Sequence, residues 1–169
     1  MRPLLNLLYR GTGALAAVFM VGVLVMVIAG IVTRELGIYV RGTDDYAGYC
    51  MAAAGFLALA YTFKHGEHIR VTLLLNCLSP RHKHWLELWC LSAAVLLSGL
   101  FCFYSIRLSY QSWDFNDVST GNDATPLWIP QIGMALGTLV LCIAFIDEWV
   151  LEWRGERVTL SSDEALHNE

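Results

Sequence analysis

The sequence predicts an all-α integral membrane protein with four transmembrane helices and both termini in the cytoplasm. Of the 169 residues 56% are hydrophobic and 15% are charged, whereas a soluble domain has about 25% charged residues. Four runs contain no charged residue and no histidine, and each is close to the roughly 17–25 residues that span a bilayer as a helix. These runs cover residues 11–33, 46–63, 88–106 and 124–146.

The first run, 11–33, lies between Arg10 and Arg34. It is longer than the roughly 7–15 apolar residues of a cleaved signal peptide, so we expect a retained transmembrane helix. The second run, 46–63, follows Asp44 and Asp45. Since backbone groups in lipid must be satisfied within the segment, both runs should be α-helices, and neither shows the alternation of a barrel strand.

The third run, 88–106, is bounded by charged residues on both sides. The fourth, 124–146, contains Pro126 and Pro130 near its start, where the missing N–H of proline costs little. Tryptophans sit near the ends of the predicted spans, as membrane-interface anchors do.

The lysines and arginines set the orientation, because cytoplasmic loops carry an excess of them. Eight lie on the side of the termini and of the connection between the second and third runs, and three lie on the other side. The termini and the central connection are therefore predicted to be cytoplasmic. The eight are Arg2, Arg10, Lys64, Arg70, Arg81, Lys83, Arg154 and Arg157, and the three are Arg34, Arg41 and Arg107.

The central connection is predicted to hold a short helix from Glu67 to Leu78 that lies in the cytoplasmic membrane interface. Its polar residues Glu67, His68 and Arg70 are candidates for fixing that helix in place. We find no internal repeat and no linker. Residues 1–153 are therefore predicted to form one membrane domain, and residues 154–169 a polar cytoplasmic tail.

The neutral interior of the spans argues against several functions. Ion-coupled carriers place ionisable groups inside the membrane, so this chain alone is a poor candidate for a complete transporter. All five histidines lie outside the runs and match no zinc spacing, which argues against a haem or metal site. No catalytic motif is present, and the net charge of −4 gives no reason to expect nucleic acid. We expect neither enzymatic activity nor a cofactor.

Small residues on two runs are candidates for close helix packing. Gly133 and Gly137 form a G-x-x-x-G pattern on the fourth run, and Gly48, Ala52 and Gly55 lie on the second. These positions fit either packing among the four helices of this chain or docking on a larger partner, and the sequence leaves both open.

The order of several motifs resembles a known family. Arg34 ends the first run, Asp44 and Asp45 open the second, Gly66-Glu67-His68-Ile69-Arg70-Val71 follows it, and Pro126-Leu127-Trp128-Ile129-Pro130 opens the fourth. This pattern is similar to the small membrane (DctQ-like) subunit of tripartite ATP-independent periplasmic (TRAP) transporters, and it extends from about residue 9 to residue 153.

The resemblance implies a multi-pass subunit of the bacterial inner membrane. It implies a non-catalytic scaffold for a large elevator-type membrane subunit, in sodium-coupled uptake of an organic anion such as a carboxylate. A periplasmic substrate-binding protein would deliver the anion, and membrane lipid would surround the complex. Charged residues of the external face are candidates for contact with the binding protein, although ordinary solvent-exposed charges would look the same. They are Arg34, Arg41, Asp44, Asp45, Asp114, Asp117 and Asp123.

Two other functions are open to a chain of this pattern. A membrane anchor of a redox complex would bind haem or quinone, and bound haem would give a strong Soret band. A small stand-alone exporter would transport its cargo in liposomes without any other subunit.

Overall fold

The computed structural model describes residues 2–38, 40–64, 80–121 and 123–154. These residues form four long α-helices, each long and apolar enough to cross a membrane, as the sequence predicted. In the described part of the chain, β-structure is limited to one bridge between Val118 and Pro126. The helices are α1 (Arg2–Glu35), α2 (Thr43–Lys64), α4 (Pro80–Asp114) and α5 (Trp128–Arg154).

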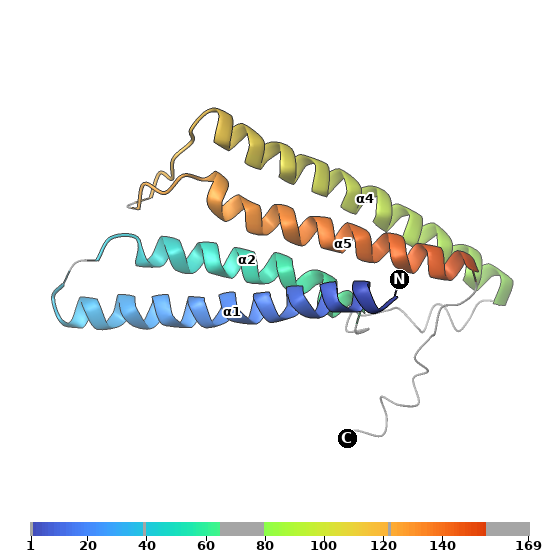
Figure 1. The fold of residues 1–169 in the computed structure, drawn as a ribbon, viewed down its shortest axis with the longest axis horizontal. Coiled ribbons are helices and arrows are strands. Elements are labelled where there is room, and N and C mark those ends of the chain that lie inside the picture. The colour runs from blue at the N-terminus through green and yellow to red at the C-terminus, as the bar shows by residue number, and fades with distance from the viewer. Residues whose placement is uncertain (1, 39, 65–79, 122, 155–169) are drawn as a thin grey trace, which may run out of the picture.

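The four helices lie side by side in the order α1, α2, α5, α4 (Figure 1). The extensive contacts join α1 to α2, α2 to α5 and α5 to α4. Because successive helices run in opposite directions, the molecule has two distinct ends. We call the end formed by residues 34–38, 40–46, 113–121 and 123–128 the loop end. The end formed by residues 2–12, 60–64, 84–92 and 147–154 is the terminal end.

The central position of α2 and α5 follows from their small side chains. A Cβ atom on Gly137 of α5 would lie 2.5 Å from the carbonyl oxygen of Phe56 on α2, and one on Gly133 would lie 2.9 Å from the Cβ of Ala53. The two backbones therefore approach each other as closely as glycine allows, and this proximity maximises van der Waals contact in lipid.

The outer helices are much less covered by the protein than the central ones. In the apolar stretch of α2, 28% of the residues are buried, against 6% in α1 and 11% in α4. A small core lies near the terminal end, where α1, α2 and α5 meet. Its buried members are Tyr9, Ala60, Val140 and Ala144, with Leu5, Leu8 and Phe63 packed against them.

The contact between α4 and α5 is built on a seven-residue spacing. Leu91, Ser98, Ser105 and Ser112 are all buried on α4, and Thr138 is fully buried on α5. A seven-residue repeat keeps one seam of a helix facing its neighbour when the two helices cross at a small angle. Small hydroxyl residues along the seam allow the two helices to pack closely.

The predicted start of the fourth helix was wrong. The run was expected to be helical from residue 124, but α5 begins at Trp128. Ala124 has a φ of +49°, Thr125 accepts a backbone hydrogen bond from Ser119, and Pro126 pairs with Val118. Residues 124–127 therefore belong to the loop before α5 and not to the helix.

Residues 65–79 and 155–169 lie outside the described residues. The predicted interfacial helix from Glu67 to Leu78, with Glu67, His68 and Arg70, therefore stays a prediction. The same holds for the polar tail after Arg154.

Candidate functional site

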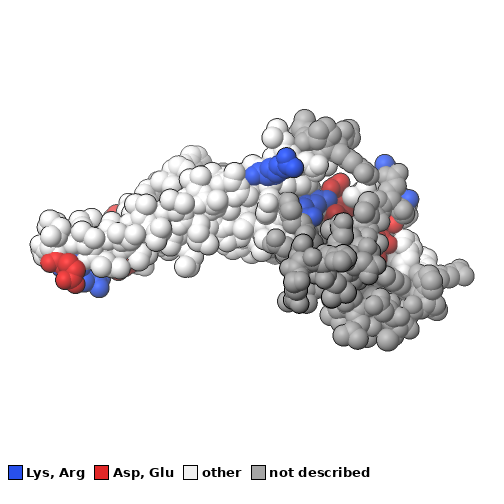
Figure 2. Space-filling view, turned by 90° about the horizontal axis from the view of Figure 1, so that it is seen from below, with Lys and Arg blue, Asp and Glu red and all other residues white. Residues whose placement is uncertain are grey.

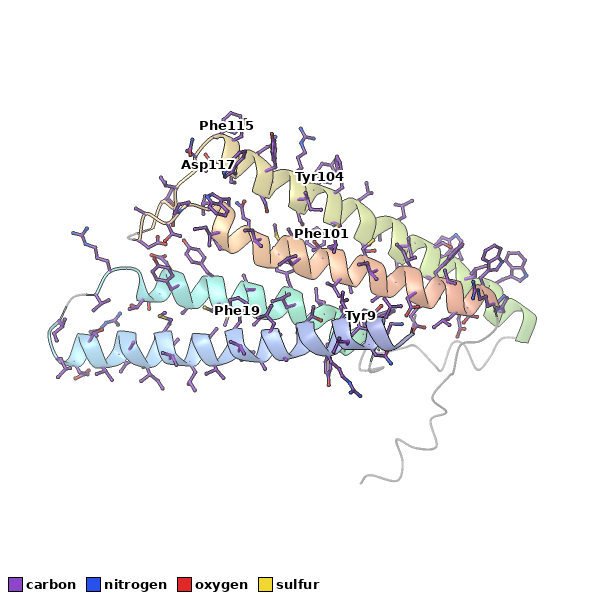
Figure 3. All side chains as sticks on the ribbon, in the orientation of Figure 1. Tyr9, Phe19, Phe101, Tyr104, Phe115 and Asp117 are labelled. Atoms are coloured by element: carbon purple, nitrogen blue, oxygen red, sulfur yellow. The ribbon has the colours of Figure 1, made fainter. Side chains whose placement is uncertain are left out.

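The loop end carries a folded segment, residues 115–127, that returns across the start of α2. Its two arms are joined by backbone hydrogen bonds from Ser119 N to Thr125 O (2.8 Å) and from Leu127 N to Asp117 O (3.0 Å). Phe115 and Asp117 lie on this segment, far from Tyr9 at the terminal end (Figure 3). We call residues 115–121 and 123–127 the folded loop.

Two tyrosines of α2 fasten the folded loop. The Tyr49 hydroxyl donates a hydrogen bond to the Ser119 hydroxyl (2.8 Å), which also accepts one from the backbone N–H of Gly121 (3.1 Å). The Tyr46 hydroxyl shares a hydrogen bond with the Thr125 hydroxyl (3.0 Å). These contacts tie the α1–α2 pair to the α4–α5 pair at the loop end.

Asp123 lies inside this arrangement. Both of its carboxylate oxygens are shielded from solvent. The neighbouring Thr125 hydroxyl, helped by that of Ser119, favours the ionised form and lowers the pKa of Asp123. Gly42, at a φ of +78°, makes room for it, because a Cβ there would lie 2.7 Å from the Asp123 Cβ.

Asp45 is the second acidic residue held against the folded loop. A Cβ atom on Gly121 would lie 2.7 Å from its Oδ2 atom, so the loop backbone passes directly over this carboxylate. Asp45 is half-buried, and it lies in the first turn of α2, where a negative charge is favoured by the helix dipole.

The other predicted external charges are exposed. Arg34 and Asp44 approach to 3.9 Å, with 81% and 85% of their side chains exposed. A pair of this kind contributes roughly 0–1 kcal/mol to stability, so both groups remain accessible. Arg41, Asp114 and Asp117 are also exposed. A cavity of about 370 Å³ between the ends of α1 and α2 is lined by Thr33, Arg34, Asp44 and Asp45, among others.

All seven predicted external residues thus lie at the loop end. Arg34, Arg41, Asp44, Asp114 and Asp117 present their charges outward, whereas Asp45 and Asp123 support the folded loop. Contact of any of them with a binding protein stays a prediction.

The terminal end holds an ion cluster that the sequence reasoning missed. Lys64 at the end of α2 donates hydrogen bonds to Asp147 and, at 2.9 Å, to Glu148 of α5. Its ammonium group also lies 5.3 Å from the ring centre of Tyr9 on α1, within range of a cation–π interaction. Three helices therefore meet at one lysine. In the sequence Lys64 counted only toward the orientation, and Asp147 is simply the first charged residue after the fourth run.

A second polar contact joins α4 to α5 at the same end. His84 Nδ1 lies 2.8 Å from Glu152 Oε1, and Glu152 is only 6% exposed. The indole N–H of Trp149 donates a hydrogen bond to the Ser92 hydroxyl (2.9 Å). No local feature of the sequence indicates either pair, because the partners are more than fifty residues apart.

The predicted packing residues divide into two groups. Gly133 and Gly137 lie in the α2–α5 contact. Gly48, Ala52 and Gly55 are exposed, and a Cβ atom on Gly48 or Gly55 would meet nothing within 4 Å. Of the two interpretations that the sequence left open, the first group supports packing within the chain. In the second group, Gly48 and Gly55 have no close neighbour among the described residues, and Ala52 is exposed.

The charges visible in Figure 2 gather toward the two ends of the molecule, and a long white surface separates them. The uncharged runs explain this surface, since none of them contains an ionisable acid, base or histidine. The arrangement offers apolar surface along the spans and charged surface at the ends, which suits contacts with lipid and with other proteins.

Comparison with known proteins supports this description. No curated protein matches the chain. Residues 23–155 match the family described as the DctQ component of tripartite ATP-independent periplasmic transporters. The match covers all of α2, α4 and α5 and the second part of α1. The chain therefore belongs to the DctQ family of TRAP transporter components.

Proposed function

We propose that this chain is the non-catalytic scaffold subunit of a TRAP transporter. It supports a large elevator-type membrane subunit during sodium-coupled uptake of an organic anion, such as a carboxylate, that a periplasmic protein delivers. The observation that carries the proposal is the combination of a neutral interior with an open row of helices. The chain has apolar surface to offer a partner, and its spans lack the charged groups that an ion path requires.

The arrangement of the helices supports a bracing role. Side-by-side helices enclose only the contacts between neighbours, and most of the buried residues at the described contacts are alanine, serine or threonine. The ion cluster at Lys64 and the folded loop fasten the row at its two ends. A row fastened in this way is suited to hold a fixed position while a neighbouring subunit moves.

The same proposal fixes the orientation in the bacterial inner membrane. With the terminal end in the cytoplasm, as the lysine and arginine distribution favours, the loop end faces the periplasm. Arg34, Arg41 and Asp44 are then accessible to the binding protein, together with Asp114 and Asp117 of the α4–α5 pair.

Reconstitution in liposomes tests the function. The cargo is chosen as a carboxylate that raises the melting temperature of the partner binding protein. With an inward sodium gradient, we expect uptake by the large subunit together with this chain, and at most a few per cent of it when either is omitted. Full uptake by the large subunit alone would refute the scaffold role, and accumulation by this chain alone would refute the claim that it carries no ion path.

A further inference from the structure

An apolar groove runs along the surface between α1 and α2. Its volume is about 790 Å³, and residues of both helices line it, from Gly13 to Val27 on α1. No charged residue takes part in the lining. Small residues make up half of it, so that the backbones themselves form much of its floor: Gly13, Ala16, Ala17, Ala54 and Ala58.

The length of the groove favours a protein occupant over a lipid chain. From Gly13 to Val27 the helix rises about 21 Å, at about 1.5 Å per residue. One leaflet of the hydrocarbon core is about 15 Å deep, half of roughly 30 Å. The groove therefore extends past the reach of an acyl chain anchored on one side, whereas a transmembrane helix would follow its whole length.

The exposed small residues of α2 continue this surface. Ala58 in the groove lies three residues after Gly55, and positions three and four apart are neighbours on a helix surface. Gly55 in turn is three residues from Ala52, which is four from Gly48. The groove and these exposed residues thus form one area where another backbone can approach closely.

The opposite edge of the row, formed by α4, exposes large side chains instead of small ones. Along α4 the exposed side chains are large and aromatic, including Trp89 (70% exposed), Phe103 (60%) and Tyr104 (58%). Tyr104 is labelled along this helix in Figure 3. Bulky rings hold another backbone away, and aromatic side chains are well accommodated by lipid and its interface. Close helix contact is therefore favoured at the α1–α2 face.

We propose that a transmembrane helix of the large membrane subunit packs into the groove between α1 and α2. This inference rests on the proposed function for the identity of the partner. It adds the face at which the partner binds, and it assigns the α4 edge to lipid. The contact is held by van der Waals packing against small residues, which is the main attraction between helices in lipid.

Site-specific photo-crosslinking in the intact membrane complex tests the face. A benzophenone amino acid is placed at Met20 or Leu24 in the groove, and at Leu97 or Phe103 on α4 as controls. We expect adducts with the large subunit from the groove positions and lipid adducts from α4. Adducts with the large subunit from α4 alone would overturn the inference, as would lipid or a second copy of this chain as the sole product in the groove.

A matched pair of substitutions gives an independent readout. Ala17→Leu fills the groove, whereas Ala14→Leu adds the same side chain at an exposed position of α1 outside it. We expect Ala17→Leu to lower recovery of the large subunit with this chain about tenfold, the scale of one over-packed contact. With Ala14→Leu, recovery of the large subunit should stay within about twofold of that with the unchanged protein, since a leucine side chain is as apolar as the lipid tails around it.

Equal effects of the two substitutions would overturn the choice of face. The outcome for the proposed function is separate. If the unchanged chain fails to co-purify with any large membrane subunit, the scaffold role itself fails. If co-purification is intact but the adducts arise elsewhere, only the groove assignment fails.

Discussion

Replacing Gly137 by alanine adds one methyl group at the tightest point between the two halves of the molecule. The new Cβ would lie 2.5 Å from both the carbonyl carbon and the carbonyl oxygen of Phe56. These are backbone atoms of α2, so no side-chain rotation relieves the clash. Ordinary van der Waals contact begins at 3.4 Å, and the difference, 3.4 minus 2.5, requires the helices to separate by about 0.9 Å.

The expected cost follows from over-packing. An extra methyl group in a closely packed site costs about 1–3 kcal/mol, and the better helix propensity of alanine returns at most about 1 kcal/mol. We expect a net loss of about 1–2 kcal/mol in the free energy of unfolding. For a domain of this size each kcal/mol lowers the melting temperature by about 2–4 °C, so a decrease of roughly 2–8 °C is expected.

Gly99→Ala on α4 is the matched control, because a Cβ atom there meets nothing within 4 Å. Gly133→Ala is the intermediate case, since its nearest contact is the Ala53 Cβ at 2.9 Å. Tryptophan fluorescence during heating in detergent measures all three. The melting temperature should be highest for Gly99→Ala, lower for Gly133→Ala and lowest for Gly137→Ala. If Gly137→Ala and Gly99→Ala have the same melting temperature, the close approach of α2 and α5 does not determine stability.

Three further predictions concern the charged ends. Lys64→Met should lower the melting temperature by about 2–8 °C in the same assay. The substitution leaves the carboxylates of Asp147 and Glu148 without their cation, which costs about 1–2 kcal/mol in the free energy of unfolding. Lys64→Arg should keep most of the melting temperature, and an equal decrease in both variants would argue against charge pairing. The lowered pKa of Asp123 means that its stabilising effect is complete above the ordinary value of 3.8 and is lost as the pH falls through the lower folded value. Limited proteolysis of the folded loop should therefore accelerate in strong acid, and Asp123→Asn should weaken this dependence on pH. If the Asp123→Asn variant shows the same pH profile as the unchanged protein, Asp123 does not stabilise the loop. Arg34→Glu and Arg41→Glu should reduce binding-protein-dependent uptake at least about threefold while co-purification with the large subunit stays intact, since rim charges act mainly on association; unchanged uptake would remove these residues from the docking surface.

The four spans were predictable because one physical quantity, the thickness of the hydrocarbon core, sets the length of an uncharged run. The start of α5 was not. Pro126 and Pro130 fit the first turn of a helix, but the bridge between Val118 and Pro126 draws residues 124–127 into the folded loop. An isolated segment carries no sign of such a contact.

The order of the helices could not be read from the sequence for a related reason. A helix that is apolar on every side has no polar face to mark where its neighbour lies. Small residues are the remaining signal, and Gly133 and Gly137 were predicted from them as packing positions. A Cβ atom on either would come within 3 Å of α2, but the sequence does not name that partner. The seven-residue spacing of Ser98, Ser105 and Ser112 carried the same information for α4 and was overlooked.

Polar contacts at the two ends were beyond local reasoning altogether. Tyr46 and Thr125 are separated by 79 positions, and Lys64 and Glu148 by 84. Nothing in the neighbouring sequence distinguishes these residues. Only the antiparallel packing of the helices places the two partners of each pair at the same end of the molecule.

An open row of four helices would be unstable in water, where the hydrophobic effect would close it into a bundle. Lipid tails are as apolar as leucine, so in a membrane this driving force between helices is absent. The row therefore keeps its shape through a few local devices: the glycine contacts of α2 and α5, the serine seam of α4 and the fastenings at each end. None of these contacts covers the outer surface of α1 and α2. That surface therefore stays available for close packing with another transmembrane helix.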